Sequence, residues 1–273
     1  MDLSALSIIS FLGIGVAAGA TAGLIGVGGG IVTVPFLYWM LTGSGTDSQT
    51  AFNIARGTSL AIMILTSASS AFGHRKLNHV DASLAARLSI SGAPGVLVGS
   101  ALGAMLNVTI PRTVFGCVSI LVAAYFFLRK DIGDDESEPE PARARIWIWV
   151  LGFFVGGFSG FLGIGGGTVA IPVMTLLLGM RAHRAVGTSA ALVVPISVLG
   201  AACYVALGWG KMPAASHMAG YVSGPALFAI SATSVIAANV FAKLTGRISA
   251  VWVRRLFGIY MAATGLKMVS ELL

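Results

Sequence analysis

The stretch that decides the fold occurs twice. Residues Gly23–Pro35 read GLIGVGGGIVTVP, and residues Gly160–Pro172 read GFLGIGGGTVAIP. Both copies lie in long runs without a charged residue, from Leu3 to Thr46 and from Ile146 to Met180. Each glycine weakens a helix by about 1 kcal/mol relative to alanine. Glycines clustered inside such apolar runs therefore indicate a backbone conformation that other residues do not adopt easily.

The composition predicts an all-α integral membrane protein. The chain has 273 residues, of which 56% are hydrophobic and only 10% are charged, and its mean hydropathy is +0.90. A soluble fold of this size is rarely so apolar. The net charge of +7 would suggest nucleic acid in a soluble protein. Here the basic residues flank apolar runs, as in membrane proteins, so we expect a lipid bilayer and no nucleic acid as partner.

The chain divides into ten apolar segments and one polar linker. The second and seventh segments have about 13 residues, too few for the roughly 20 helical residues that cross a bilayer. Residues 129–145 are acidic, contain proline and are flanked by arginines, which is typical of a solvated linker. We therefore expect a first membrane repeat over 1–128 and a second over 146–273. The segments lie at about 4–24, 30–42, 54–73, 82–106, 111–128, 146–162, 167–179, 185–208, 217–242 and 249–272.

The distribution of basic residues predicts that the two repeats are inverted. If each glycine motif returns the chain to the side from which it came, thirteen of the seventeen lysines and arginines collect on one face. If each motif merely interrupts one spanning helix, the two faces carry nearly equal numbers. Because membrane proteins concentrate positive charge in the cytoplasm, the first arrangement is favoured. It places the linker in the cytoplasm and both termini outside, with the second repeat inverted relative to the first.

An inverted pair of motifs predicts an anion site near the middle of the membrane. Each motif would form the tip of a hairpin, followed by a short helix whose N-terminal N–H groups and positive dipole end favour an anion. Pro35 and Pro172 would suit the first turn of these helices. The alternative is that the glycines only permit close helix packing. The predicted substrate-binding residues in the two motifs are Gly26, Gly28, Gly29, Gly30, Thr33, Gly163, Gly165, Gly166, Gly167 and Thr168.

Further candidate ligands follow the short helices. Thr58, Ser59, Thr188 and Ser189 belong to a Gly-Thr-Ser triplet that occurs in both repeats. Their hydroxyls either donate to an oxyanion or bond back to a carbonyl one turn earlier. Arg56 precedes the first triplet, whereas valine precedes the second. It either supplies a cation to an anionic ligand or extends to the membrane surface.

These features together resemble the sulfite exporter TauE/SafE family of membrane permeases. The resemblance rests on the duplicated Gly-x-Gly-Gly-Gly with its proline five residues later, the two Gly-Thr-Ser triplets, the two-fold organisation and the length. It extends from about Phe11 to Leu266. It implies a multi-pass protein of the bacterial plasma membrane that transports small sulfur-containing anions, such as sulfite or organosulfonates, commonly outward.

Export of this kind requires no catalytic residue, cofactor or metal. A negative charge leaving a cell with a negative interior gains about 2.3 kcal/mol per 100 mV, so we expect neither ATP hydrolysis nor an enzyme. A passive anion channel would have the same architecture. A second alternative is a rhomboid-like intramembrane serine protease built on Ser159 and His217, although Ala22 replaces the serine in the first repeat.

Overall fold

The computed structural model describes residues 5–128, 144–212, 217–245 and 250–271. It confirms an all-α membrane protein. Six of its helices, those numbered 1, 3, 4, 5, 8 and 9 in the list that follows, are long and apolar enough to cross a bilayer. The long helices are α1 (Ala5–Ile25), α3 (Ser48–Arg75), α4 (Ala82–Met105), α5 (Thr109–Leu128), α6 (Ala144–Leu162), α8 (Ala182–Leu207), α9 (Gly224–Leu244) and α10 (Ala250–Ser270).

Short elements follow the two glycine motifs. Helix α2 spans Gly30–Gly43, and helix α7 spans Gly167–Pro172 and continues as the π-helical turn η2 (Val173–Leu177). The short second and seventh segments are therefore confirmed. The sequence predicted the two prolines in the first turn of these helices, and this prediction is wrong. Pro35 is the sixth residue of α2, and Pro172 is the sixth of α7. Proline removes a helical hydrogen bond, and the helix changes to π geometry directly after Pro172.

The ninth segment departs from the sequence prediction. Instead of a helix from residue 217, a two-stranded antiparallel hairpin of β1 (Met218–Ala219) and β2 (Val222–Ser223) precedes α9. Gly220 in its turn has a φ of 54°, a conformation that glycine adopts readily. The predicted linker lies outside the described residues except for 144–145, which begin α6.

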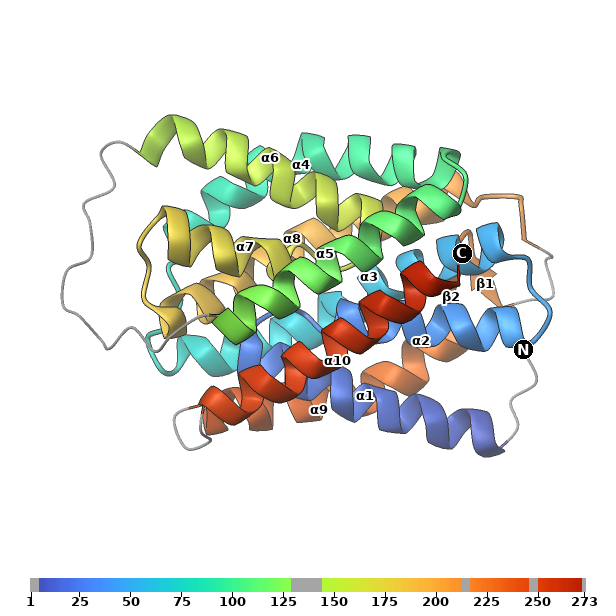
Figure 1. Cartoon of the computed structure of the whole chain (residues 1–273), viewed down its shortest axis with the longest axis horizontal. Coiled ribbons are helices and arrows are strands. Elements are labelled where there is room, and N and C mark those ends of the chain that lie inside the picture. The colour runs from blue at the N-terminus through green and yellow to red at the C-terminus, as the bar shows by residue number, and fades with distance from the viewer. Residues whose placement is uncertain (1–4, 129–143, 213–216, 246–249, 272–273) are drawn as a thin grey trace.

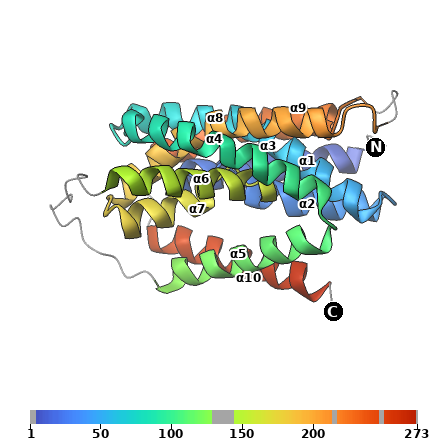
Figure 2. The same cartoon turned by 90° about the horizontal axis from the view of Figure 1, so that it is seen from above.

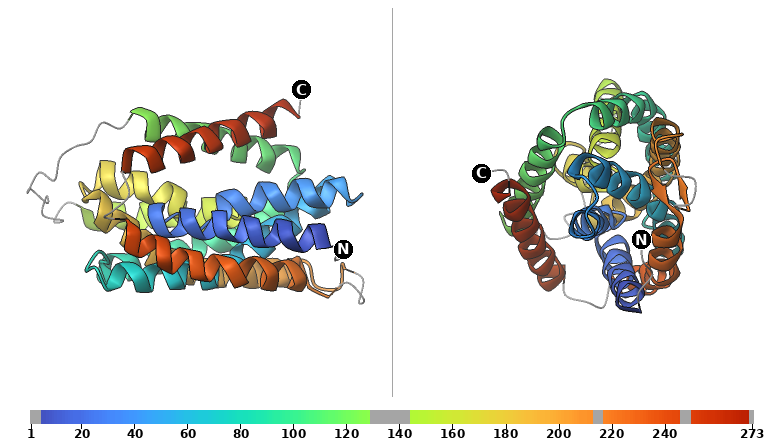
Figure 3. Two further views of the ribbon diagram at one scale, coloured as in Figure 1. Left: turned by 90° about the horizontal axis from the view of Figure 1, so that it is seen from below. Right: turned by 90° about the vertical axis from the view of Figure 1, so that its right-hand side faces the viewer.

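The helices form one elongated bundle (Figure 1). Helix α1 begins and helix α10 ends toward one end of the bundle, whereas α5 ends and α6 begins at the opposite end. Helices α5 and α10 pack against each other as a separate layer beside the other helices (Figures 2 and 3). Helix α3 is the most central, because 83% of its spanning residues are buried, against 39–44% in the other five spanning helices.

The four helix pairs with the most extensive contact each join the first repeat to the second. They are α4 with α6, α1 with α9, α3 with α8, and α5 with α10. Small residues permit the closest of these approaches. An ideal Cβ added to Gly95 in α4 would lie 2.0 Å from the carbonyl oxygen of Phe153 in α6, and one added to Gly19 in α1 would lie 2.4 Å from that of Ser234 in α9. Neither repeat is therefore a separately packed unit.

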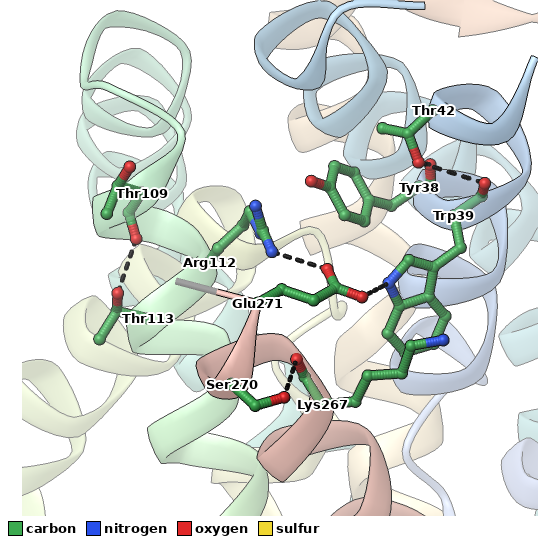
Figure 4. Close-up of polar contacts among 9 residues, drawn as sticks. All are labelled: Tyr38, Trp39, Thr42, Thr109, Arg112, Thr113, Lys267, Ser270 and Glu271. Atoms are coloured by element: carbon green, nitrogen blue, oxygen red, sulfur yellow. Dashed lines mark hydrogen bonds and ion pairs between the residues drawn. The ribbon is translucent and has the colours of Figure 1, made fainter. Parts of the chain in front are cut away.

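A polar cluster ties the α5 and α10 layer to α2 (Figure 4). Arg112 of α5 forms an ion pair of 2.8 Å with Glu271 at the end of α10. The same carboxylate accepts a hydrogen bond of 3.0 Å from the indole of Trp39 in α2. The ammonium of Lys267 lies 4.1 Å from the centre of the Trp39 ring, and the guanidinium of Arg112 lies 4.9 Å from that of Tyr38. These contacts fix the far end of α2 and so help to set the position of its first turn.

Candidate functional site

The two glycine motifs have the same unusual backbone. Three glycines of each motif have positive φ angles, and the last of the three is the N-cap of the following short helix. Residues with a Cβ rarely adopt this left-handed conformation, whereas the packing glycines of α1, α4 and α6 do not require it. The glycines of the motifs are therefore needed for the backbone conformation as well as for close packing. The φ angles are 76°, 83° and 83° at Gly26, Gly28 and Gly29, and 75°, 73° and 77° at Gly163, Gly165 and Gly166.

The two motifs also touch each other. An ideal Cβ added to Gly30 would lie 2.8 Å from the Cα of Ile164 in the second motif. One added to Gly167 would lie 2.8 Å from the carbonyl oxygen of Gly26 and 2.9 Å from the Cα of Val27. The first residue of each short helix thus packs against the turn of the other motif, and glycine leaves the room for it.

Consecutive N–H groups in both motifs lack a protein acceptor. Among the backbone hydrogen bonds that the described residues form outside their helices, none at ordinary hydrogen-bond distance is donated by the N–H groups of residues 27–31 or 164–168, although all these residues are buried. Buried backbone N–H groups are almost always paired. Successive free N–H groups in a turn with left-handed residues form a concave anion-binding site. The arrangement therefore suits an anion without any cationic side chain.

The threonines of the Gly-Thr-Ser triplets join the two repeats. The hydroxyl of Thr58 in α3 accepts a hydrogen bond of 2.9 Å from the N–H of Ser223, the N-cap of α9. The hydroxyl of Thr188 in α8 accepts one of 3.0 Å from the N–H of Asp81, the N-cap of α4. Each threonine thus fixes the start of a helix in the other repeat. Each of these hydroxyls accepts in this bond, so its role as a donor to an oxyanion stays a prediction.

The serines of the triplets hold the glycine turns of the opposite repeat. Ser59 donates a hydrogen bond of 2.9 Å to the carbonyl of Gly163, and Ser189 donates one of 2.9 Å to the carbonyl of Gly26. Thr33 of α2 contacts the Ser59 hydroxyl at 2.7 Å. Thr168, by contrast, has a buried hydroxyl with no hydrogen-bond partner. Of the predicted hydroxyls, Thr168 therefore keeps its hydrogen-bonding capacity for another molecule.

Replacing these serines is expected to destabilise the turns. Ser59→Ala and Ser189→Ala should each lower the free energy of unfolding by about 1–3 kcal/mol, because each leaves a buried carbonyl without its donor. Thr113→Ala is a suitable control, since that exposed hydroxyl bonds only within α5. Thermal unfolding of the purified variants in detergent measures the effect. Equal melting temperatures for all three variants would show that these bonds do not support the turns.

Arg56 lies beside the second glycine motif, since a Cβ added to Gly163 would lie 2.7 Å from its Cα, and its guanidinium forms hydrogen bonds with protein groups. Its side chain is completely buried and lies between the rings of Phe52 and Tyr204, at 4.7 and 5.4 Å from their centres. It donates hydrogen bonds of 2.8 Å to the carbonyls of Phe161 and Gly103, near the C-terminal ends of α6 and α4. Two further bonds go to the Phe52 carbonyl and to the side-chain oxygen of Asn53. Most of its donors are therefore engaged, and it does not extend to a membrane surface.

Sequence reasoning missed two further side chains that hold the motifs. His74 of α3 lies 2.8 Å from the carbonyl of Gly23, and Tyr204 of α8 donates a hydrogen bond of 3.0 Å to the carbonyl of Gly160. The two glycines are the first residues of the two motif copies, and His74 and Tyr204 are 130 residues apart, as Thr58 and Thr188 are. Aligning the repeats through their Gly-Thr-Ser triplets would have identified this pair.

The serine and histidine of the protease alternative do not form a pair. Ser159 is buried in α6 and its hydroxyl has no hydrogen-bond partner. An ideal Cβ added to Gly166 would lie 3.4 Å from the Cβ of Ser159, so this serine packs against the turn of the second motif. His217 is exposed and precedes β1. No hydrogen bond of the described residues joins the two side chains, so the geometry does not activate a nucleophile.

Comparisons with known proteins agree with this architecture. The family model described as sulfite exporter TauE/SafE matches residues 11–268. A probable membrane transporter protein of Haemophilus influenzae is 26% identical over 257 residues, covering 93% of this chain and 95% of its own length. One of Bacillus subtilis is 28% identical over 218 residues, covering 74% and 80%. One of Methanocaldococcus jannaschii is 25% identical over 266 residues, covering 94% and 93%. No solved structure matches the chain.

Proposed function

The chain belongs to the sulfite exporter TauE/SafE family and is a membrane transporter, and we propose on that premise that its cargo is a small sulfur-containing anion moved outward. Sulfite and organosulfonates are the substrate class. The observation that carries the proposal is the pair of buried, unpaired N–H rows at residues 27–31 and 164–168. Oxygens of a sulfite or sulfonate group are strong acceptors for such N–H groups.

The proposed ligands are the backbone N–H groups of both glycine motifs together with the Thr168 hydroxyl. Ser59 and Ser189 hold the turns in place from the opposite repeat. Arg56 contributes positive charge nearby, while most of its donors fix α4 and α6. Dipoles bind an anion less tightly than a full ion pair would, which suits a carrier that must also release its cargo.

Transport would proceed by movement of two inverted repeats around this site. The four helix pairs that each join one repeat to the other support a two-fold relation between them. In transporters of this architecture, one part rocks against another and opens the central site to each side in turn. The membrane potential drives an anion outward by about 2.3 kcal/mol per charge and 100 mV, so no second substrate is needed.

The orientation we propose places the linker in the cytoplasm of a bacterial inner membrane and both termini outside. The helix ends on the linker side carry Arg75, Arg87, Arg181, Arg184 and Lys243. Such an excess of basic residues is typical of cytoplasmic ends. Cysteine labelling of intact cells from outside, at residues near each end, tests this orientation directly.

Counterflow in proteoliposomes tests the function. Vesicles containing the purified protein and unlabelled sulfite should accumulate radiolabelled sulfite transiently, and sulfoacetate inside should stimulate the same uptake. Acetate inside should not, because it lacks the sulfur oxyanion group. Stimulation by acetate alone would contradict the proposed substrate class. Uptake without any stimulation from the opposite side would instead identify a passive anion channel.

A further inference from the structure

The space between the two glycine turns is filled by two apolar side chains. An ideal Cβ added to Gly28 would lie 3.0 Å from the sulfur of Met63 and 3.0 Å from Cγ1 of Val193. One added to Gly165 would lie 2.8 Å from the same sulfur and 2.9 Å from the same methyl group. The two side chains belong to α3 and α8 and are completely buried. The turns therefore meet across Met63 and Val193.

These two residues do not satisfy the turns that they touch. A thioether is a weak hydrogen-bond acceptor and a methyl group is none, so neither side chain offers a good acceptor to the N–H groups of the turns that it touches. Ser67, one turn after Met63 in α3, adds to this mismatch. Its hydroxyl is buried without a partner, and it would lie 3.1 Å from a Cβ on Gly28. An unpaired buried hydroxyl thus lies beside the first glycine turn, close to the apolar side chain of Met63.

The two occupants differ in mobility. Met63 and Val193 occupy equivalent positions, 130 residues apart as Thr58 and Thr188 are. Methionine is unbranched, has several rotatable bonds and adapts to irregular spaces. Valine has two carbons on Cβ and is stiff about χ1. An entering molecule can therefore displace the Met63 side chain by rotation, whereas it cannot displace Val193 without moving α8.

We propose that Met63 occludes the anion site and determines which anions fit, and this inference rests on the proposed function. In the closed site its thioether stands where an anion would contact both glycine turns. An arriving sulfite or sulfonate rotates the side chain aside and takes up the N–H groups of the turns. The displaced thioether then packs against the organic part of the anion, so that its volume limits the length of that part. Val193 forms the fixed opposite wall.

Replacement of Met63 tests this assignment by the ratio of two transport rates. Met63→Ala should raise the rate for sulfoacetate relative to that for sulfite about tenfold, because a methylene group discriminates by about this factor in a fitted pocket. Met63→Leu should keep the wild-type ratio. Ile62→Ala is the matched control, since Ile62 is equally buried in α3 but is not among the nearest neighbours of any motif glycine. An unchanged ratio in a folded Met63→Ala protein would overturn the inference.

A second measurement does not depend on transport. Met63→Cys, made together with Cys117→Ser and Cys203→Ser, should react with a small charged thiol reagent and be protected by sulfoacetate. Ile62→Cys in the same background should not react. If the wild type carries no sulfur anion but the Met63 position reacts and is protected, the proposed cargo is wrong and the occluding position stands. If the wild type carries sulfite but the Met63 position neither reacts nor is protected, the occluding role is wrong.

Discussion

Gly29→Val is expected to abolish anion flux while the protein still inserts into the membrane. Gly29 has a φ of 83°, and holding a β-branched residue in this conformation costs about 1–3 kcal/mol. The added Cβ would also lie 2.6 Å from the carbonyl oxygen of Ala18 in α1. The turn must therefore move, and the N–H groups of residues 27–31 move with it. Uptake of radiolabelled sulfite into proteoliposomes measures the loss.

Two matched variants show whether the loss comes from the turn. Gly13 lies in α1, before the first glycine motif, and an added Cβ there meets nothing within 4 Å. Flux in Gly13→Val should therefore remain at the wild-type rate. Gly166→Val has the same backbone strain, but its nearest neighbour is a methyl group of Val155 at 2.9 Å. A side chain yields more easily than a carbonyl, so we expect a smaller loss of protein stability. Wild-type flux in both Gly29→Val and Gly166→Val would contradict the proposed anion site.

Arg56→Gln is expected to lower the free energy of unfolding by roughly 3–6 kcal/mol, because two buried carbonyls each lose a charged donor worth about 1.5–3 kcal/mol. The carbonyls of Phe161 and Gly103 belong to the last turns of α6 and α4, where carbonyls lack partners within the helix. The arginine supplies those partners and places a positive charge at the negative ends of both helices. Arg56→Lys should recover part of the stability.

Thermal unfolding with and without sulfite separates this role from ligand binding. Lys211→Gln, which removes an exposed cation, should melt as the wild type does. Arg56→Gln should melt at a much lower temperature, yet sulfite should still raise that temperature. A variant that melts like the wild type but no longer responds to sulfite would contradict the structural role and make Arg56 a direct ligand.

The local conformation of the glycine motifs could be predicted from sequence, because it depends on the residues themselves. Repeated glycines in a long apolar run have few physical explanations, and the charge-free run after them was too short to span a bilayer. The limits of α2 differ from the expected ones by a single residue. The hairpin before α9 was missed because its strands have only two residues each and no alternating pattern.

The partners of the predicted side chains could not be derived in the same way. Ser59 bonds Gly163, Thr188 bonds Asp81, and Arg56 bonds Phe161, in each case across more than a hundred residues of chain. A hydroxyl or guanidinium shows its capacity to donate from sequence alone. The partner that it meets, donor or acceptor, depends on how two helices pack, and the periodicity of residues within one helix contains no information about this. Met63 was missed for the same reason, since a methionine in an apolar helix indicates only a packing residue.

The crossed hydrogen bonds between the repeats determine when the protein can mature during its synthesis. The ribosome completes Gly26 and Asp81 long before Ser189 and Thr188, which supply their partners. Helix α1 likewise awaits α9, the penultimate helix. We therefore expect the first five helices to remain in the membrane without these partners until the second repeat has been made. We expect the first glycine turn to acquire its final geometry only after Ser189 has been made, so a chain that ends before this residue should transport no anion.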